Sequence, residues 1–315
     1  MGTMERLSGL LPDLREALLA SGTMREVRLR AGKPIELVDD DGRRRQGAPL
    51  SREQLAKALM ALMDYSVHAH EEDIASGYFT LEDGCRVGLC GRANEAGKIL
   101  GVEGVGSACV RLARQVKGCA DALMPHIMKG GRPRSALILS PPGLGKTTCL
   151  RDAVRQLSMA GYHVCVADER HEIAACHRGA PTLDIGPGTD VMDGGRKAVT
   201  IPVMLRAMSP RVVAADEIGG PGDGAALADA RRCGVTVLAT AHGEGLEALE
   251  RRPALREVSG LFDVCVLLGD TPGRLKAVWE AGDVPGRWKA VWRAPGLLPG
   301  GASTEEVTAR CAGGS

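Results

Sequence analysis

A short stretch of the chain combines residue types suited to holding phosphate groups. It reads SPPGLGKTT and lies between the apolar run SALILS and the helical pattern TCLRDAVRQLSMAG. Glycines let backbone N–H groups turn inward around phosphate oxygens, and the N-terminus of the following helix adds its positive end. This strand, loop and helix order is the context of a P-loop and predicts a nucleoside triphosphate site, for ATP with Mg²⁺. The predicted contacts are Ser140, Pro141, Pro142, Gly143, Leu144, Gly145, Lys146, Thr147 and Thr148.

Three side chains of this loop carry separate expectations. Lys146 is expected to bridge the β- and γ-phosphates, and Thr147 to place its hydroxyl on Mg²⁺. Ser140 stands where the pattern G-x-x-x-x-G-K-[ST] begins with glycine. A serine adopts the required conformation at some cost, so we expect a cost in nucleotide affinity.

Carboxylates follow two other apolar runs. RVVAAD ends in Asp216-Glu217, where Asp216 is predicted to reach the Mg²⁺ shell and Glu217 to polarise the attacking water. HVCVAD is followed by Glu169, a rival candidate for orienting water, because strand ends of such a sheet line the ligand crevice. Structural ion pairing is the alternative for Glu169. Asp184, Asp190 and Asp193 alternate with glycines, fit no calcium loop and are interpreted as loop residues.

Two basic side chains lie beside these acids. His242 follows the run VTVLAT and could sense the γ-phosphate between the two phosphate-facing loops, or could cap a helix or bond a carbonyl. Arg170 could pair with an acid, or reach the nucleotide of a neighbouring subunit. Both alternatives stay open for each residue.

The elements that must position these residues fall into two domains and a tail. Up to Lys129, alternating strand patterns and two amphipathic helices predict a small α+β domain, with Ser51 as a helix N-cap and Asp83-Gly84 as a hairpin turn. We assign this domain, 1–129, to oligomer or partner contacts because it holds no catalytic constellation. Five continuous apolar runs then predict an α/β domain with a parallel sheet over 130–293. The Gly- and Pro-rich stretch 294–315 predicts a flexible tail.

Composition limits the function classes. The formal net charge is +1 and aromatic residues make up 3%, which argues against nucleic acid as a partner. The ten cysteines form no C-x-x-C pair, so they are interpreted as reduced core residues. With no signal peptide or long apolar run, these features predict a cytoplasmic protein without a transmembrane segment.

Several of these motifs together resemble the stage III sporulation protein AA family. The resemblance rests on DERHEIAACHRGAPTLDIGPGTDVMDGGRKA, MLRAMSPRVVAADEIG, TVLATAHG and SPPGLGKTT, with REVRLRAGKPIEL and YSVHAHEEDIASGYFTLEDGCRVGLCGRA before them. It covers about residues 7 to 280. The chain departs from the family pattern at Ser140, at Gly188 where the family has arginine, and in VTIPVMLRAMSP.

The resemblance implies a RecA-like ATPase related to the motors of type II and type IV secretion and pilus systems. It also implies a homo-oligomer, a hexameric ring, in the mother cell of endospore formers, held at the membrane through protein partners of a secretion-like channel. The residues that match its Walker A pattern are Gly143, Gly145, Lys146, Thr147 and Thr148, and Asp216-Glu217 match its Walker B. Arg170, Arg196 and Arg206 are candidates for an arginine acting across the subunit interface.

We therefore expect an oligomeric ATPase that powers or gates a membrane complex. A nucleotide-dependent ring scaffold with little turnover is the alternative, which Ser140 favours. A nucleic-acid translocase is the third reading, against which charge and composition argue.

Overall fold

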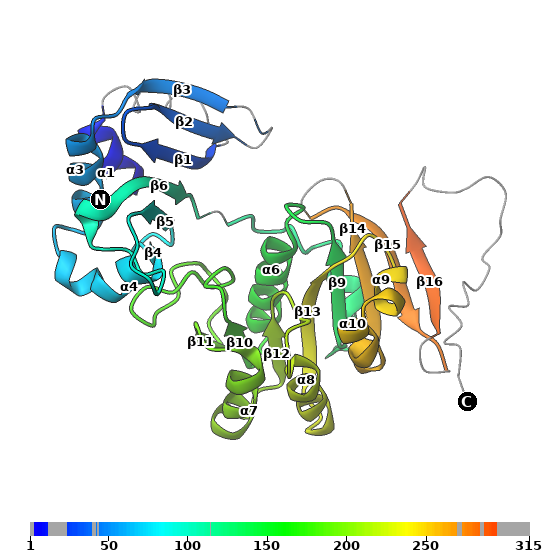
Figure 1. Cartoon of the computed structure of the whole chain (residues 1–315). Helices are drawn as coiled ribbons and strands as arrows, with labels where there is room; N and C mark the ends of the chain where they lie inside the picture. The colour runs from blue at the N-terminus through cyan, green and yellow to red at the C-terminus, as the bar shows by residue number, and fades with distance from the viewer. Residues whose placement is uncertain are drawn as a thin grey trace. The chain divides into compact units, whose positions relative to one another are not determined.

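The structure, a computed structural model, describes residues 3–11, 24–39, 42, 44–113, 115–269, 273–283 and 287–294. The chain divides into two compact units. Unit 1 is Met1–Arg114 with Ala175–Leu183, and unit 2 is Gln115–Ala174 with Asp184–Ser315. Figure 1 shows the helices and strands of both units.

Unit 1 is built on a six-stranded antiparallel sheet of order β3-β2-β1-β6-β5-β4. Its strands are β1 (Met24–Arg30), β2 (Pro34–Asp39), β3 (Arg44–Pro49), β4 (Tyr78–Thr80), β5 (Arg86–Gly91) and β6 (Val105–Arg111). Its helices are α1 (Thr3–Leu10), α3 (Arg52–Leu62), α4 (Glu71–Ser76) and the 3₁₀ turns η1 (Val67–His70) and η2 (Val102–Gly104).

Alternation along the strands explains why this sheet has one buried face. In β1, Val27 and Leu29 are fully buried, whereas the arginines between and after them are partly exposed. Successive side chains of a strand point to opposite faces, so the apolar set packs on α1 and α3 in one core. The predicted α+β character of this part of the chain is confirmed.

Two local predictions in unit 1 are also confirmed. Ser51 caps α3 in a capping box, because its hydroxyl accepts from the Gln54 N–H at 3.1 Å and the Gln54 side chain accepts from the Ser51 N–H at 2.8 Å. The turn at Asp83-Gly84 joins the antiparallel pair β4 and β5, with Gly84 at a φ of 77° that favours glycine.

Unit 2 is built on an eight-stranded sheet of order β11-β10-β12-β13-β9-β14-β15-β16. The first six strands of this order run parallel, and the last two are antiparallel additions. They are β9 (Ala136–Ser140), β10 (Val164–Asp168), β11 (Thr189–Asp193), β12 (Val212–Ala215), β13 (Thr236–His242), β14 (Val264–Leu268), β15 (Leu275–Ala281) and β16 (Trp288–Arg293). A two-stranded ribbon, β7 (Met128–Lys129) with β8 (Arg132–Pro133), precedes β9.

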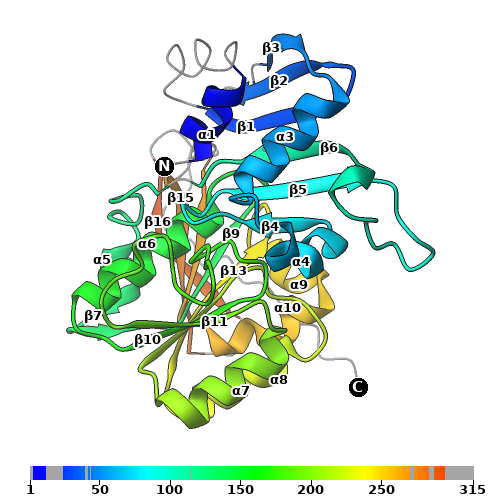
Figure 2. The ribbon, with the colours of Figure 1, turned by 90° about the vertical axis from the view of Figure 1, so that its left-hand side faces the viewer.

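Helices cover both faces of this sheet. They are α5 (Met124–Ile127), α6 (Lys146–Met159), α7 (Lys197–Met208), α8 (Asp223–Arg232), α9 (Glu247–Arg251), α10 (Pro253–Val258) and the 3₁₀ turn η3 (Ser259–Leu261). Figure 2 shows α7 and α8 on one side of the sheet and α6 on the other. Strands covered on both faces explain the continuous apolar runs in the sequence.

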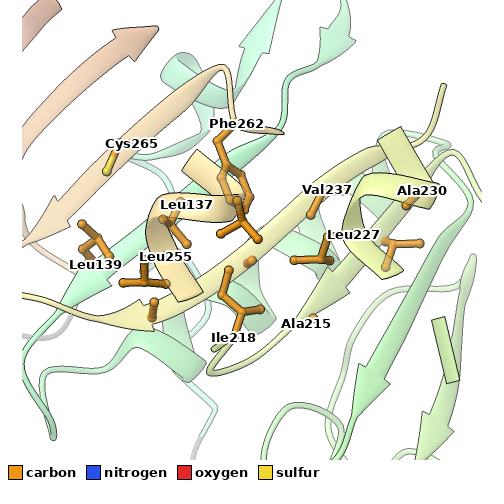
Figure 3. Packing of buried hydrophobic residues seen from close by; sticks show 14 of the residues in the cluster. Leu137, Leu139, Ala215, Ile218, Leu227, Ala230, Val237, Leu255, Phe262 and Cys265 are labelled. Atoms are coloured by element: carbon orange, nitrogen blue, oxygen red, sulfur yellow. The ribbon is translucent and has the colours of Figure 1, made fainter. Parts of the chain in front are cut away.

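The larger core lies between the sheet and helices α7, α8 and α10. Figure 3 shows Leu227 of α8, Leu255 of α10 and Phe262 directed toward side chains of the sheet such as Leu137 and Val237. Each fully buried apolar side chain of this size contributes about 1.5–3 kcal/mol. This packing holds the strands whose ends carry the candidate site. The predicted parallel α/β domain flanked by helices is confirmed.

The units divide at different places from the expected boundary after Lys129. Residues 115–129 belong to unit 2. The Ala120 N–H donates to the Asp152 carboxylate of α6 at 2.9 Å, and the Cys119 thiol donates to the Thr148 carbonyl at 3.3 Å, so this segment is bound to α6.

A second difference is that residues 175–183 return to unit 1. There His177 Nδ1 lies 3.2 Å from the Thr80 carbonyl oxygen of β4. The expected tail 294–315 lies outside the described residues apart from Ala294. Within the described part of the chain, none of the helices is long and apolar enough to cross a bilayer.

The interpretation of Asp190 and Asp193 as loop residues is wrong. Both lie on β11, which pairs in parallel with β10 at the edge of the sheet. Residues of β11 are half-buried or exposed, so this strand lacks the apolar run that marks the other parallel strands. Asp184 lies in the preceding loop, as expected.

Candidate nucleotide-binding site

The candidate phosphate loop joins the centre of the sheet to a helix. Ser140 is the last residue of β9, and α6 begins at Lys146. Gly143 and Gly145 both have a φ of 80°, a left-handed conformation that glycine adopts without a Cβ clash. The loop between strand and helix therefore places its glycines where the backbone turns, directly before the N-terminus of α6, which is an end of a helix that favours anions.

Ser140 occupies a position that does not need glycine. It is fully buried, has the backbone of a strand residue, and its hydroxyl donates to the Pro141 carbonyl at 2.8 Å. The left-handed residues of the loop are Gly143 and Gly145 instead. The expected conformational cost of Ser140 is therefore absent from this loop geometry.

Lys146 is held by neutral acceptors at the base of the loop. Its ammonium group lies 3.3 Å from the Ser140 carbonyl, 3.2 Å from the Pro141 carbonyl and 3.1 Å from His242 Nδ1. The residue is only 5% exposed, and this desolvation lowers the pKa of Lys146. A charged donor satisfied by neutral partners can exchange them for phosphate oxygens, which is what the predicted role requires.

Strand order brings the two acidic positions to this loop. β13 lies next to β9, and β12 lies next to β13. The three strands are parallel, so the residues at or just after their carboxyl ends lie at the same edge of the sheet as the loop. The Thr147 hydroxyl donates to the Asp216 carboxylate at 2.5 Å, and the Thr240 hydroxyl donates to the same carboxylate. A hydroxyl and a carboxylate are the hard oxygen ligands that Mg²⁺ prefers, so this pair fits the predicted metal.

Glu217 has an unusual backbone and two basic partners. Its φ is 48°, which is uncommon for a residue with a side chain, and its N–H donates to the Thr240 hydroxyl at 2.8 Å. The carboxylate forms an ion pair with Arg170. One of its oxygens also lies 3.0 Å from His242 Nε2. Left-handed residues of this kind cluster at functional sites, where the surrounding structure holds them in place.

His242 connects Lys146 to Glu217 through the two nitrogens of its ring. Burial, with the neighbouring charges of Lys146 and Arg252, lowers the pKa of His242. The neutral ring accepts from Lys146 at Nδ1 and donates to Glu217 from Nε2–H. Arg252 also donates to the His242 carbonyl at 2.8 Å, which fixes the residue at the end of β13. The capping and carbonyl-bonding alternatives do not describe this ring.

Glu169 lies apart from this network. Its carboxylate accepts from the Lys197 ammonium at 2.6 Å, and this hydrogen bond lowers the pKa of Glu169. Asp168, just before it, is buried and accepts N–H bonds from residues 172–174, so it shapes the turn after β10. Of the two glutamates considered from the sequence, Glu217 is the one joined to Lys146 through His242.

Three arginines are candidates for a role across a subunit interface. Arg170 pairs within the chain with Glu217. Arg196 lies 3.5 Å from the Pro221 carbonyl, and Arg206 is exposed in the last turn of α7.

A pocket of about 390 Å³ begins one residue after Glu217 and was not singled out from the sequence. The Asp223 carboxylate accepts from the N–H groups of Gly219 at 3.1 Å and Gly220 at 2.9 Å, which shapes its wall. The glycine-rich run GGPGDG is the sequence feature that could have indicated this pocket. The lining comprises Ile218, Gly219, Gly220, Pro221, Gly222, Asp223, Gly224, Ala225, Ala254, Glu257 and Val258.

The chain has a RecA-like fold, with the candidate phosphate loop at the centre of a mainly parallel sheet. Among solved structures, the ATPase DotB of Legionella pneumophila is similar with a TM-score of 0.55 and 16% identity, over 84% of this chain and 75% of DotB. The pilus retraction motor PilT, with bound ADP, gives a TM-score of 0.54 and 15% identity, over 82% of this chain and 77% of PilT. These likenesses establish the fold.

The sequence comparisons establish the family. A profile of the family described as "Sporulation stage III, protein AA" matches residues 7–284. Stage III sporulation protein AA of Bacillus subtilis (strain 168) is 39% identical over 245 residues, which are 74% of this chain and 78% of the Bacillus protein. The chain belongs to the Sporulation stage III, protein AA family, and the resemblance seen in its motifs is confirmed.

Proposed function

We propose that the chain binds ATP with Mg²⁺ on residues 140–148, hydrolyses it, and works as an oligomeric motor of endospore formation. In this proposal, hydrolysis powers or gates a secretion-like channel complex between mother cell and forespore, with the chain on the mother-cell side of the membrane. One observation carries the enzymatic part: Lys146, Thr147, Asp216, Glu217 and His242 meet at one edge of the sheet. The sporulation role follows from family membership.

The loop and the first turn of α6 provide the phosphate site. Backbone N–H groups after Gly143 and Gly145 would face the phosphate oxygens, and Lys146 would exchange its carbonyl partners for the β- and γ-phosphates. Thr147 and Asp216 would hold Mg²⁺ by their oxygens. The bound ion supplies neutralisation of the charge that develops on the transferred phosphoryl group.

Glu217 and His242 provide the hydrolytic step. Glu217 would accept a hydrogen bond from the attacking water and align it with the γ-phosphate. Its present partners, Arg170 and His242, hold the carboxylate on the side of the loop. When Lys146 binds phosphate instead, His242 loses the hydrogen-bond donor at Nδ1. The position of the ring beside Glu217 would then depend on whether the loop holds a nucleotide.

Self-association is the second part of the proposal. We propose a hexameric ring, in which Arg170, Arg196 or Arg206 of one subunit acts on the nucleotide of the next. Unit 1 would supply contacts within the ring or with membrane proteins of the channel. The fold shared with the pilus retraction motor PilT supports the motor part of the proposal.

The test is Mg²⁺-dependent ATP hydrolysis per subunit across a range of protein concentrations, with sedimentation of the same samples. A motor with shared sites predicts turnover that rises as the ring forms. Tight ATP binding and ring formation without turnover would support the ring scaffold instead. Stimulation by single- or double-stranded DNA at low salt would support a nucleic-acid translocase.

A further inference from the structure

A histidine, a cysteine and an aspartate meet on the edge strands of the unit 2 sheet, away from the phosphate loop. We propose that His163, Cys165 and Asp190 form a binding site for Zn²⁺. Their candidate ligand atoms all lie within 4.8 Å of one another. His163 Nε2 and the Asp190 carboxylate are already in contact at 2.6 Å.

Strand geometry explains why these three side chains share one face. His163 immediately precedes β10, and Cys165 lies two residues further along the chain, so both side chains point to the same side of the sheet. Asp190 is the register partner of Cys165 on the parallel neighbour β11. Directly opposed residues of paired strands project side by side, which brings the carboxylate to the thiol.

The backbone on both sides of the cluster is fixed by hydrogen bonds. The His163 carbonyl accepts from the N–H groups of Arg211 at 3.0 Å and Val212 at 3.2 Å. The Val164 N–H donates to the Gly188 carbonyl at 3.0 Å, just ahead of β11. A site on paired strands is held more precisely than one on loops, so metal binding needs only side-chain adjustment.

The donor set selects the type of metal. One imidazole nitrogen, one thiolate sulfur and one carboxylate oxygen are all zinc ligands, whereas Mg²⁺ and Ca²⁺ take oxygen. Three protein ligands leave a fourth position for water. The His163 and Asp190 side chains are 35% and 47% exposed, so an ion can reach the fully buried sulfur from their side.

Zinc binds cysteine as the thiolate, so uptake by Cys165 displaces the thiol proton. The bound ion would link β10 to the edge strand β11 and stabilise the folded protein, because it binds only the native arrangement.

The experiment is a titration of the tag-free full chain with Co²⁺, a coloured stand-in for Zn²⁺, followed by competition with Zn²⁺ and by thermal unfolding. The wild type is expected to give a thiolate-to-cobalt absorption band that saturates at one equivalent and disappears when Zn²⁺ is added. Zn²⁺ is expected to raise its Tm. The test variants are Cys165→Ser and the partly exposed His163→Gln, and Cys265→Ser is the matched control.

Cys265 is buried on the same sheet, and burial alone raises the pKa of its thiol. The band should vanish in Cys165→Ser, weaken at least about tenfold in apparent affinity in His163→Gln, and persist in Cys265→Ser. If Cys165→Ser fails to fold, His163→Gln decides. The proposal is overturned if the wild type gives no band, if both test variants keep the wild-type affinity, or if the band is lost in Cys265→Ser.

Discussion

The carboxylate of Glu217 and the imidazole of His242 lie 3.0 Å apart, Oε1 to Nε2, although Glu217 follows β12 and His242 is the last residue of β13. The other ring nitrogen of His242 lies 3.1 Å from the Lys146 ammonium. One neutral ring thus joins the lysine proposed to bind phosphate to the glutamate proposed to position water.

Replacing Glu217 should separate binding from hydrolysis. Glu217→Gln is expected to keep ATP affinity within about threefold and lower kcat by at least about 100-fold, because the amide cannot act as the water's acceptor. Nucleotide binding and steady-state hydrolysis measure the two effects.

Glu169→Gln is the matched control for this change. It removes the partner of Lys197, which is only 4% exposed, and should lower the free energy of unfolding by about 1 kcal/mol with kcat nearly unchanged. If Glu169→Gln abolishes turnover and Glu217→Gln does not, the assignment of the water-positioning glutamate is reversed.

Acidification should impair the site through His242. Its folded-state pKa lies below the ordinary value of 6.5, so the neutral ring contributes stability that is present above pH 6.5 and lost as the pH falls through the lowered value. Protonation also removes the Nδ1 acceptor and places a second cation beside Lys146. The acid limb of the ATPase profile should therefore have an apparent pKa below 6.5.

His242→Gln is the variant for this test. Glutamine does not titrate, so the free energy of unfolding of this variant should lose the part of its pH dependence that comes from His242. An unchanged acid limb in both stability and remaining turnover would contradict the assigned role of the ring.

The loop geometry predicts opposite outcomes at two positions. Ser140→Gly should change ATP affinity by less than about threefold, because Ser140 has strand backbone. Gly143→Ala should weaken binding, because its φ of 80° costs a residue with a Cβ about 1 kcal/mol or more. Titration with a fluorescent ATP analogue measures both affinities. A large gain in affinity for Ser140→Gly would show that Ser140 carries the cost expected from the sequence.

The sequence patterns predicted the central sheet well because five of its strands are continuous apolar runs. β11 escaped prediction because an edge strand buries little, and TDVMD carries two acids. The return of residues 175–183 to unit 1 depends on contacts with residues far away in the chain, such as Thr80, which local patterns do not encode.

Part of the candidate site could be proposed from the sequence alone. The candidate phosphate loop is a contiguous motif, so its residues could be named from spacing. The links from His242 to Lys146 and to Glu217 depend on the order β12-β13-β9, which a single sequence does not specify. The ion pair between Arg170 and Glu217 likewise joins residues that follow two separate strands, β10 and β12.

The most direct test of the central claim is Mg²⁺-dependent ATP hydrolysis by the wild type and by Lys146→Ala, at a concentration where the wild type is assembled. Lys129→Ala is the matched control, because the Lys129 side chain is 72% exposed and lies on β7 outside the loop. The account predicts wild-type turnover that falls at least about 100-fold in Lys146→Ala and is unchanged in Lys129→Ala. Equal turnover in all three proteins would contradict it.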